Sequence, residues 1–326
     1  MIRTPITRRT LLAGSAAFVF HAHAATANWP SRPIRLVVPG PAGSGMDIFG
    51  RLIAQQLQEA LRQTVVVDNK PGANSLIGTD NVAKAPADGY TLLLSPSSAI
   101  AINPIIQAKM PYDTEKDLLP VAQVGSAGIL LVAHPSTGFK NLADLVRHAK
   151  AQPGKLVYGS WGSGSTGHLA MEGIKAHYGL AMEHVPFKGV AQLVTDMLGN
   201  NIPVGFTDIA SPVPHIRAGK LVALGCTGSA RGPALPEVPT LYEQGFRFDM
   251  NGWYGVFAPA GTPPEVVQRL NQEINRILAT DEVIQKFALQ NMAKPPIKSV
   301  EQFATTVKQD VAIWQNLAKV AKLRVD

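Results

Sequence analysis

The chain contains a single cysteine, Cys226, among its 326 residues, so an intrachain disulfide is excluded. This cysteine ends the apolar run LVALGC at residues 221–226, which is typical of a strand, and we therefore predict a buried structural thiol. The sequence has no H-E-x-x-H motif and no set of cysteine ligands, so it predicts no metal site. It also has no G-x-S-x-G elbow, which leaves a lipase-type serine nucleophile without local support. We expect a protein that holds no cofactor and no metal and that is not an enzyme.

A run of lysines and arginines with aromatic residues between them, the pattern typical of nucleic-acid binding, is also missing. Charges are scattered along the chain, and the formal net charge is +7. Arg3, Arg8 and Arg9 carry three of these positive charges, and removing the segment that holds them lowers the net charge to +4. Nucleic acid is therefore not an expected partner, and the charge favours small anionic ligands only weakly.

Acidic residues are absent before Asp47, and the first 27 residues have the composition of a leader. Two adjacent arginines precede an apolar run, and two triplets of small residues follow it, ending at Ala24 and Ala27. We predict that residues 1–27 are a secretory signal peptide cleaved near Ala24 or Ala27, and that the mature protein is periplasmic. The arginine pair favours the twin-arginine export route, with an ordinary leader as the alternative. The apolar run is shorter than the roughly 20 residues that a membrane span needs.

Short apolar runs alternate with segments of helical periodicity through the rest of the chain. Such alternation is typical of α/β proteins with parallel sheets. Strands are expected at 34–38, 64–67, 90–94, 121–124, 129–133, 156–158, 184–187, 202–207, 221–225 and 251–257. Helices are expected at 48–61, 76–85, 142–151, 168–178, 191–198, 263–278, 281–289 and 300–323.

A change of direction near Gly125 and Gly128 divides this alternation into two series. The mature length of roughly 300 residues suits two domains. We predict two lobes, each a mostly parallel sheet flanked by helices, with residues 28–127 and 253–326 in the first lobe and residues 128–252 in the second. Ligands of open parallel sheets bind beyond the carboxyl ends of the strands, so two facing edges would form a cleft that closes by hinge motion.

Two segments have the composition of an anion-binding loop. The first cradle is the glycine-rich loop of residues 40–47, which follows the strand at 34–38. The second cradle is the loop of residues 159–167, which follows the apolar run at 156–158. Glycines let a ligand approach the backbone closely, and the unpaired N–H groups of the next helical turn point toward it. Because neither loop contains lysine or arginine, we predict a small anion held between the lobes by neutral groups.

Two glycine patterns in these loops resemble nucleotide-binding motifs without their context. Residues 162–167, GSGSTG, match G-x-G-x-x-G, but three residues separate the strand from the first glycine and no acidic residue ends the next strand. Residues 40–45 have the glycine spacing of a P-loop, but Met46 and Asp47 replace its lysine and its hydroxyl residue. We therefore do not expect a nucleotide ligand.

Polar side chains gather in the loops after three of the expected strands. His168 and Glu172 stand one helical turn apart and could share a metal, but we favour His168 as a helix cap or a ligand contact because no further metal ligands are evident. Helix capping is also the alternative role for any single serine. The hydroxyl residues of these loops are Ser44, Ser97, Ser98, Ser160, Ser163, Ser165 and Thr166.

Taken in order, several short stretches of the mature chain make it resemble the periplasmic substrate-binding proteins of tripartite tricarboxylate transporters, the Bug family. The resemblance covers nearly the whole mature chain. The stretches are PIRLVVP with Gly43 and Asp47, VDNKPGA at 67–73, DGYTL at 88–92, YGS at 158–160 with Gly164, Ser165, His168 and Leu169, VPFKG at 185–189, LPEVPT at 235–240, and Trp253 and Gly255 followed by APAGTP at 258–263.

The resemblance implies a two-lobed Venus-flytrap fold, the capture of small organic anions, usually carboxylates, and delivery of the ligand to integral-membrane permease subunits. In this family backbone N–H groups, hydroxyls and bridging waters of the two cradles typically hold the carboxylate. A sensor that presents its ligand to a signalling protein, or a periplasmic enzyme on the same lobes, is the alternative.

The chain departs from the family pattern at three positions. Met46 stands where threonine is usual, Phe187 where tyrosine is common, and Trp161 where small or polar residues are frequent. Each departure removes a hydroxyl or adds apolar surface. We hypothesise a ligand with a carboxylate at one end and an aromatic or extended apolar body, with the alternative that Trp161 only packs its loop.

We expect the anionic end of the ligand at the two cradles and at the loop after the third strand, and its far end at residues that follow later strands. Asp47 is expected to orient its loop or cap its helix, because two close carboxylates repel. Trp253 and the turn GTP at 261–263 are expected to be structural. The predicted ligand-binding residues are Gly43, Ser44, Gly45, Met46, Asp47, Ser97, Ser98, Ser160, Trp161, Gly162, Ser163, Ser165, Thr166 and His168 at the anionic end, and Gly189, Val190, Thr207 and Asp208 at the far end.

Overall fold

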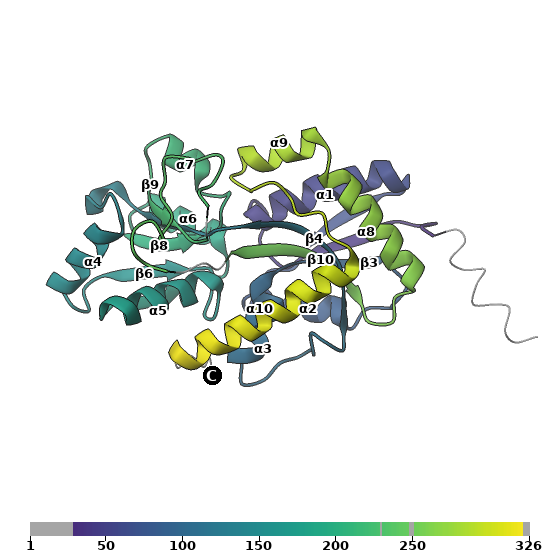
Figure 1. Cartoon of the computed structure of the whole chain (residues 1–326), viewed down its shortest axis with the longest axis horizontal. Helices are drawn as coiled ribbons and strands as arrows, with labels where there is room; N and C mark the ends of the chain where they lie inside the picture. The colour runs from purple at the N-terminus through teal and green to yellow at the C-terminus, as the bar shows by residue number, and fades with distance from the viewer. Residues whose placement is uncertain (1–28, 229, 248–250, 322–326) are drawn as a thin grey trace, which may run out of the picture.

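The computed structural model describes residues 29–228, 230–247 and 251–321. The predicted leader, residues 1–27, lies outside this part of the chain. Figure 1 shows two lobes side by side, each built on its own sheet. Within the described ranges, no helix combines the length and the apolar character that crossing a bilayer requires.

The first sheet holds five strands in the order β2-β1-β3-β10-β4. Strands β2, β1 and β3 are parallel neighbours, whereas β10 runs antiparallel to β3 and β4. Helices cover the sheet, which explains why β1 and β3 are mostly apolar and mostly buried. The strands are β1 (Ile34–Val38), β2 (Val65–Asn69), β3 (Thr91–Pro96), β4 (Leu118–Ala127) and β10 (Gly252–Pro259).

The second sheet repeats this plan with the order β7-β6-β8-β5-β9. Strands β7, β6 and β8 are parallel neighbours, and β5 runs antiparallel to β8 and β9. Four of the five strands in each sheet therefore point the same way, so the predicted α/β fold of two lobes with mostly parallel sheets is confirmed. The strands are β5 (Leu130–Ala133), β6 (Val157–Ser160), β7 (Glu183–Pro186), β8 (Val204–Thr207) and β9 (Val222–Cys226).

The antiparallel strand in each sheet is the one that arrives from the other lobe. β4 leads into β5, and the chain returns after β9 to form β10. Figure 1 shows β4 and β10 side by side. At the crossing, Ile129 N–H donates to Thr227 Oγ1 at 2.9 Å and Thr227 N–H donates to the Ile129 carbonyl at 3.0 Å. A Cβ on Gly128 would lie 1.8 Å from the Thr227 carbonyl oxygen, so only glycine fits there. The predicted lobe boundaries, after residues 127 and 252, stay a prediction.

Helices flank both sheets, and two of them begin at least two residues earlier than the apolar periodicity indicates. Helix α1 begins at Gly45 and not at 48, and α5 begins at Thr166 and not at 168, because Ser44 and Ser165 cap first turns that are polar or small. The helices are α1 (Gly45–Leu61), α2 (Leu76–Ala83), η1 (Ser98–Ile102), α3 (Asn103–Ile106), η2 (Pro135–Thr137), α4 (Leu142–Ala151), α5 (Thr166–Tyr178), α6 (Val190–Leu198), α7 (Val213–Arg217), α8 (Pro264–Leu278), α9 (Asp281–Leu289) and α10 (Val300–Ala321).

The long helix α10 contacts both lobes. It packs against β4 and η1 of the first lobe and against α5 of the second. Near its start, Phe303 is fully buried against Trp253 and Phe257 of β10. Farther along, Trp314 is 1% exposed and belongs to the apolar core that contains Ile174 of α5. The helix therefore runs along one side of the molecule and connects the two lobes through its contacts with both, as Figure 1 shows.

Candidate ligand-binding site

A cavity lies between the two sheets, at the carboxyl ends of their parallel strands. Its volume of about 80 Å³ is several times the roughly 10–15 Å³ that one water molecule needs. Each of the six parallel strands contributes a loop to its wall, as the general rule for open α/β sheets requires. The side chains in these loops are Ser44 and Met46 after β1, Asn74 and Ser75 after β2, Ser97 and Ser98 after β3, Trp161 and Thr166 after β6, Lys188 and Val190 after β7, and Asp208 and Ile209 after β8.

The first cradle is organised by Asp47, which is only 4% exposed and does not line the cavity. Its carboxylate accepts hydrogen bonds from Gly43 N–H at 2.9 Å, Arg51 Nε at 3.0 Å and Asn69 Nδ2 at 3.0 Å. Burial opposes ionisation of this carboxyl, but the bonds from Arg51, Gly43 and Asn69 hold its pKa below the usual value. Asp47 therefore fixes the shape of the loop, which agrees with the role expected from the sequence.

The N-terminus of α1 is already occupied by an acidic side chain of the other lobe. The backbone N–H of Gly45 donates to Oδ2 of Asp208 at 2.7 Å. A Cβ on Gly45 would lie 2.6 Å from that oxygen, so the approach depends on glycine. The first helical turn keeps one further N–H without a protein partner, that of Met46, within the described residues.

The second cradle is held from behind by a hydroxyl–imidazole network. Ser165 caps α5 by accepting from His168 N–H at 3.2 Å, and its own hydroxyl lies 3.1 Å from Ser160 Oγ. Ser160 Oγ lies 2.7 Å from His184 Nε2, and His168 Nδ1 accepts from Gly164 N–H at 2.9 Å. Ser160 and Ser165 are fully buried and do not line the cavity, so their hydroxyls shape the loop from within.

Burial keeps both histidines of this network neutral. Desolvation lowers the pKa of His168 below its usual value, and it lowers that of His184 to about 3, with His168 as a further cause. On the far side of His168, Glu172 accepts from Tyr158 OH and Lys175 Nζ, both at 2.6 Å. The imidazoles therefore act as neutral supports for the second cradle.

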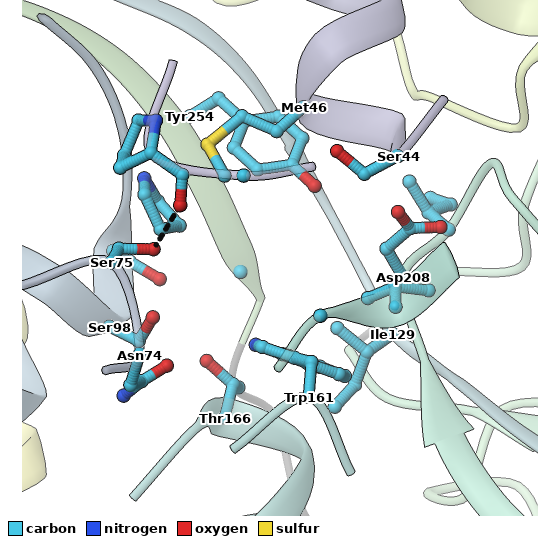
Figure 2. A pocket seen from close by; sticks show the side chains of 18 of the residues that line it. Ser44, Met46, Asn74, Ser75, Ser98, Ile129, Trp161, Thr166, Asp208 and Tyr254 are labelled. Carbon is cyan, nitrogen blue, oxygen red and sulfur yellow. Dashed lines mark hydrogen bonds between the residues drawn. The ribbon is translucent and has the colours of Figure 1, made fainter. Parts of the chain in front are cut away.

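Three polar side chains with free groups lie together on one side of the cavity. Ser98 Oγ and Asn74 Oδ1 are buried without a hydrogen-bond partner, and Thr166, 3% exposed, has no partner for its hydroxyl within the described ranges. The N–H groups of Thr166 and Gly167, in the first turn of α5, are likewise unpaired there. Figure 2 shows Asn74, Ser98 and Thr166 together on one side and Asp208 on the opposite side.

Apolar side chains form much of the remaining wall. Trp161 lines the cavity, and its ring also rests on Gly167, where a Cβ would lie 2.7 Å from Cζ3 of the indole. The tryptophan thus both packs against its loop and faces the cavity. The two roles considered for it from the sequence, contact with an apolar ligand body and packing of its loop, are therefore compatible. Tyr254 of β10 also faces the cavity, and burial, with a smaller effect of Asp208, raises its pKa well above the usual value. The other apolar side chains of the wall include Met46, Ile129, Val190, Ile209 and Met292.

The structure places half of the residues predicted for the site at the cavity and half behind its wall. Those at the wall are Ser44, Met46, Ser97, Ser98, Trp161, Thr166, Gly189, Val190 and Asp208. Those outside it are Gly43, Gly45, Asp47, Ser160, Gly162, Ser163, Ser165, His168 and Thr207, several of which shape the two cradles.

Sequence reasoning missed further residues of the wall, among them Asn74, Ser75, Ile129, Lys188 and Tyr254, and Trp253, which was expected to be structural, also lines the cavity. Asn74 and Ser75 follow a strand of the parallel set, a position that could have indicated them. Both have a left-handed backbone, with φ of 49° and 71°, as does Ala73 before them, and this uncommon conformation carries the loop to the cavity. Lys188 is exposed, so the wall does include a cation although neither cradle does.

Most of the chain is similar to known transporter receptors, in sequence and in structure. A family model described as "Tripartite tricarboxylate transporter family receptor" matches residues 49–323. Protein BugT of Bordetella pertussis is 37% identical over 293 residues, covering 89% of this chain and 90% of BugT. The structure of Rpa4515 of R. palustris with adipate is 32% identical with a TM-score of 0.88, covering 91% of this chain and 99% of that one. MatC of Rhodopseudomonas palustris with bound malate is 26% identical with a TM-score of 0.84, covering 89% and 99%. This chain belongs to the tripartite tricarboxylate transporter receptor family.

Proposed function

We propose that the protein is a periplasmic solute-binding receptor that captures a small organic carboxylate in the cavity between its lobes and delivers it to integral-membrane permease subunits. Its family consists of transporter receptors, and two solved relatives, Rpa4515 and MatC, hold the carboxylates adipate and malate. Export to the periplasm agrees with the signal peptide predicted from residues 1–27.

The observation that carries this proposal is the unpaired donor set at the start of α5. The hydroxyls of Thr166 and Ser98 lie at the cavity, and within the described residues the N–H groups of Thr166 and Gly167 are unpaired in the first turn of α5. A helix N-terminus stabilises an anion, and hydrogen bonds to a charged acceptor are stronger than neutral ones. Neutral donors also release the anion once the lobes separate and water enters, which a delivery protein requires.

The wall around these donors supports a ligand with an apolar body. The part of the wall outside the group formed by Asn74, Ser98 and Thr166 includes Met46, Trp161 and Ile129. Burying apolar ligand surface against them contributes about 25 cal/mol per Å². The departures of Met46 and Trp161 from the family pattern therefore act at the cavity itself, and we extend the proposal to acids with an aromatic or aliphatic body.

A catalytic role has little support in the same geometry. Ser160 and His184 form the pair closest to a nucleophile and its base, at 2.7 Å. However, Ser160 is fully buried behind the cradle and its hydroxyl is engaged by Ser165 and by the carbonyl of Gly162. A substrate in the cavity would not meet this oxygen, so we propose binding without turnover.

Isothermal titration calorimetry with a panel of acids tests the proposal. The panel holds acetate, hexanoate, benzoate, adipate, citrate and aspartate, and mass spectrometry of the native protein after purification identifies any acid that it already carries. We expect one-to-one binding of at least one acid, with the acid recovered unchanged. Absence of binding across the panel, together with no co-purified acid, would reject carboxylate capture.

A further inference from the structure

Asp208 joins the two lobes at the far side of the cavity from the free donors. It follows β8 in the second lobe, is 5% exposed, and its Oδ2 accepts from the N–H of Gly45 at the start of α1 in the first lobe, at 2.7 Å. Ile209 and Ala210, the next residues of this loop, pack into the apolar core of the first lobe. The loop after β8 is therefore seated against the N-terminus of α1.

The hydrogen-bonding capacity of the Asp208 carboxylate is already filled by protein groups. Oδ1 accepts from Ala210 N–H at 3.1 Å and from Ser211 N–H at 2.7 Å. Oδ2 accepts from Gly45 N–H at 2.7 Å and from Ser211 Oγ at 2.8 Å. A carboxylate offers about four lone-pair positions, and all four partners are donors, which favours the ionised form. Burial acts in the opposite direction and raises the pKa of Asp208 above its usual value, while the hydrogen bonds from Ser211, Gly45 and Ala210 limit that rise. Asp208 therefore has no acceptor position left for an amine or hydroxyl of a ligand.

The two helix N-termini at the cavity consequently differ in what they can hold. At α1, the protein supplies its own anion, because the Asp208 carboxylate lies where the carboxylate of a ligand would meet Gly45 N–H. The one N–H that stays free there within the described residues, that of Met46, follows the N–H that already holds this carboxylate. At α5, Thr166 and Gly167 keep free N–H groups, and the hydroxyls of Thr166 and Ser98 are unpaired. Figure 2 shows Thr166 and Ser98 across the cavity from Asp208.

We propose that Asp208 determines ligand specificity by serving as a built-in second carboxylate, so that the receptor prefers monocarboxylates with an uncharged far end over dicarboxylates of the same length. This inference rests on the proposed capture of a carboxylate at α5. A second ligand carboxylate would face Asp208, which lines the cavity and is only 5% exposed, and two like charges at such a poorly solvated position repel. Lys188, the cation in the wall, is exposed, so solvent screens any compensation that it gives.

Calorimetry with two matched pairs of acids tests this inference. Hexanoate is compared with adipate and benzoate with terephthalate, on the natural protein, on Asp208→Asn and on Glu59→Gln. Asp208→Asn removes the charge at nearly the same size, although its amide nitrogen can no longer accept from the two donors that met the replaced oxygen. Glu59→Gln removes an exposed carboxylate of α1 for which no contact is found within the described part. We expect the natural protein and Glu59→Gln to bind the monoacid of each pair roughly tenfold or more tightly than the diacid. We expect Asp208→Asn to reduce that ratio by a similar factor.

Each outcome decides between this inference and the function on which it rests. Adipate and terephthalate binding as tightly as their monoacids to the natural protein, or an unchanged ratio in Asp208→Asn, overturns the role of Asp208 but leaves carboxylate capture intact. No binding of any acid overturns carboxylate capture and, with it, this inference. If Asp208→Asn fails to fold, the ratio for the natural protein decides alone, and Asp208→Ser provides a second uncharged variant.

Discussion

The imidazole rings of His168 and His184 stack face to face behind the second cradle, with centroids 3.9 Å apart and planes 10° from parallel. One ring accepts from the loop backbone at Gly164 and the other contacts Ser160. Two imidazolium ions could not share this position, because each would be desolvated and would repel the other. At least one of the two rings must therefore be neutral while the stack supports the ligand-binding loop.

The depressed pKa of His184 predicts that stability falls in acid. Burial, together with His168, lowers the pKa from 6.5 to about 3 in the folded protein. Between those values the unfolded chain binds more protons than the folded chain, so the free energy of unfolding decreases as the pH falls from 6.5 toward 3. Thermal melts across that range should show the melting temperature falling, and His184→Gln should flatten the profile. His215→Gln, outside this cluster, serves as the control; an equal flattening there would contradict the assignment.

Removing the free hydroxyls should weaken acid binding without unfolding the protein. Thr166→Ala and Ser98→Ala each delete a donor that no protein group uses. A hydrogen bond to a charged group contributes about 1.5–3 kcal/mol, so the affinity for a bound acid should drop roughly tenfold or more. Thr195→Ala, which removes an exposed hydroxyl on α6, should leave the affinity unchanged. Calorimetry measures all three variants, and native affinity in both cavity variants would exclude these hydroxyls as ligand contacts.

Replacing Trp161 distinguishes its role at the cavity from its packing against Gly167. Trp161→Ser removes apolar surface from the wall, so the preference for benzoate over acetate should decrease, since burial of apolar surface drives that difference. The measurement is the ratio of the two affinities, with a thermal melt to record the loss of packing. A lower melting temperature with an unchanged ratio would show that the indole only supports its loop.

The crossing between the lobes should not accept any side chain at residue 128. Gly128→Ala would place a Cβ 1.8 Å from the backbone oxygen of Thr227, so the strands at the crossing must shift. We expect a destabilisation of about 1–3 kcal/mol or more by chemical denaturation. Gly173→Ala is the matched control, because its Cβ would meet only Phe246 Cζ at 3.4 Å and alanine favours the interior of α5. Equal stability of the two variants would contradict this account of the crossing.

Local sequence predicts most elements of the fold but not that β5 and β10 run antiparallel to the strands beside them. Apolar runs at 34–38 and 204–207 mark central strands because burial on both faces demands such runs. The antiparallel insertion of β5 and β10 depends on pairing with strands far along the chain, which no local pattern encodes. The first turn of α1 was not predicted because the helix was located by its apolar period. This turn is instead held by a capping bond, in which Ser44 Oγ accepts from Asp47 N–H.

The site was predictable where it follows strand ends and unpredictable where it depends on contacts between the lobes. Ser98, Trp161 and Thr166 lie at the cavity because each follows a parallel strand. The bond between Gly45 and Asp208 joins residues 163 positions apart, so the sequence could place both near a ligand without showing that one fills the helix N-terminus of the other.

A crystal structure with hexanoate or benzoate bound is the most direct test of the central claim. We expect the carboxylate within hydrogen-bonding distance of the Thr166 hydroxyl and of a free N–H at the start of α5, with Asp208 still bonded to Gly45 and the body of the acid against Trp161. A carboxylate at the start of α1 in place of Asp208, or a ligand outside this cavity, would contradict the account.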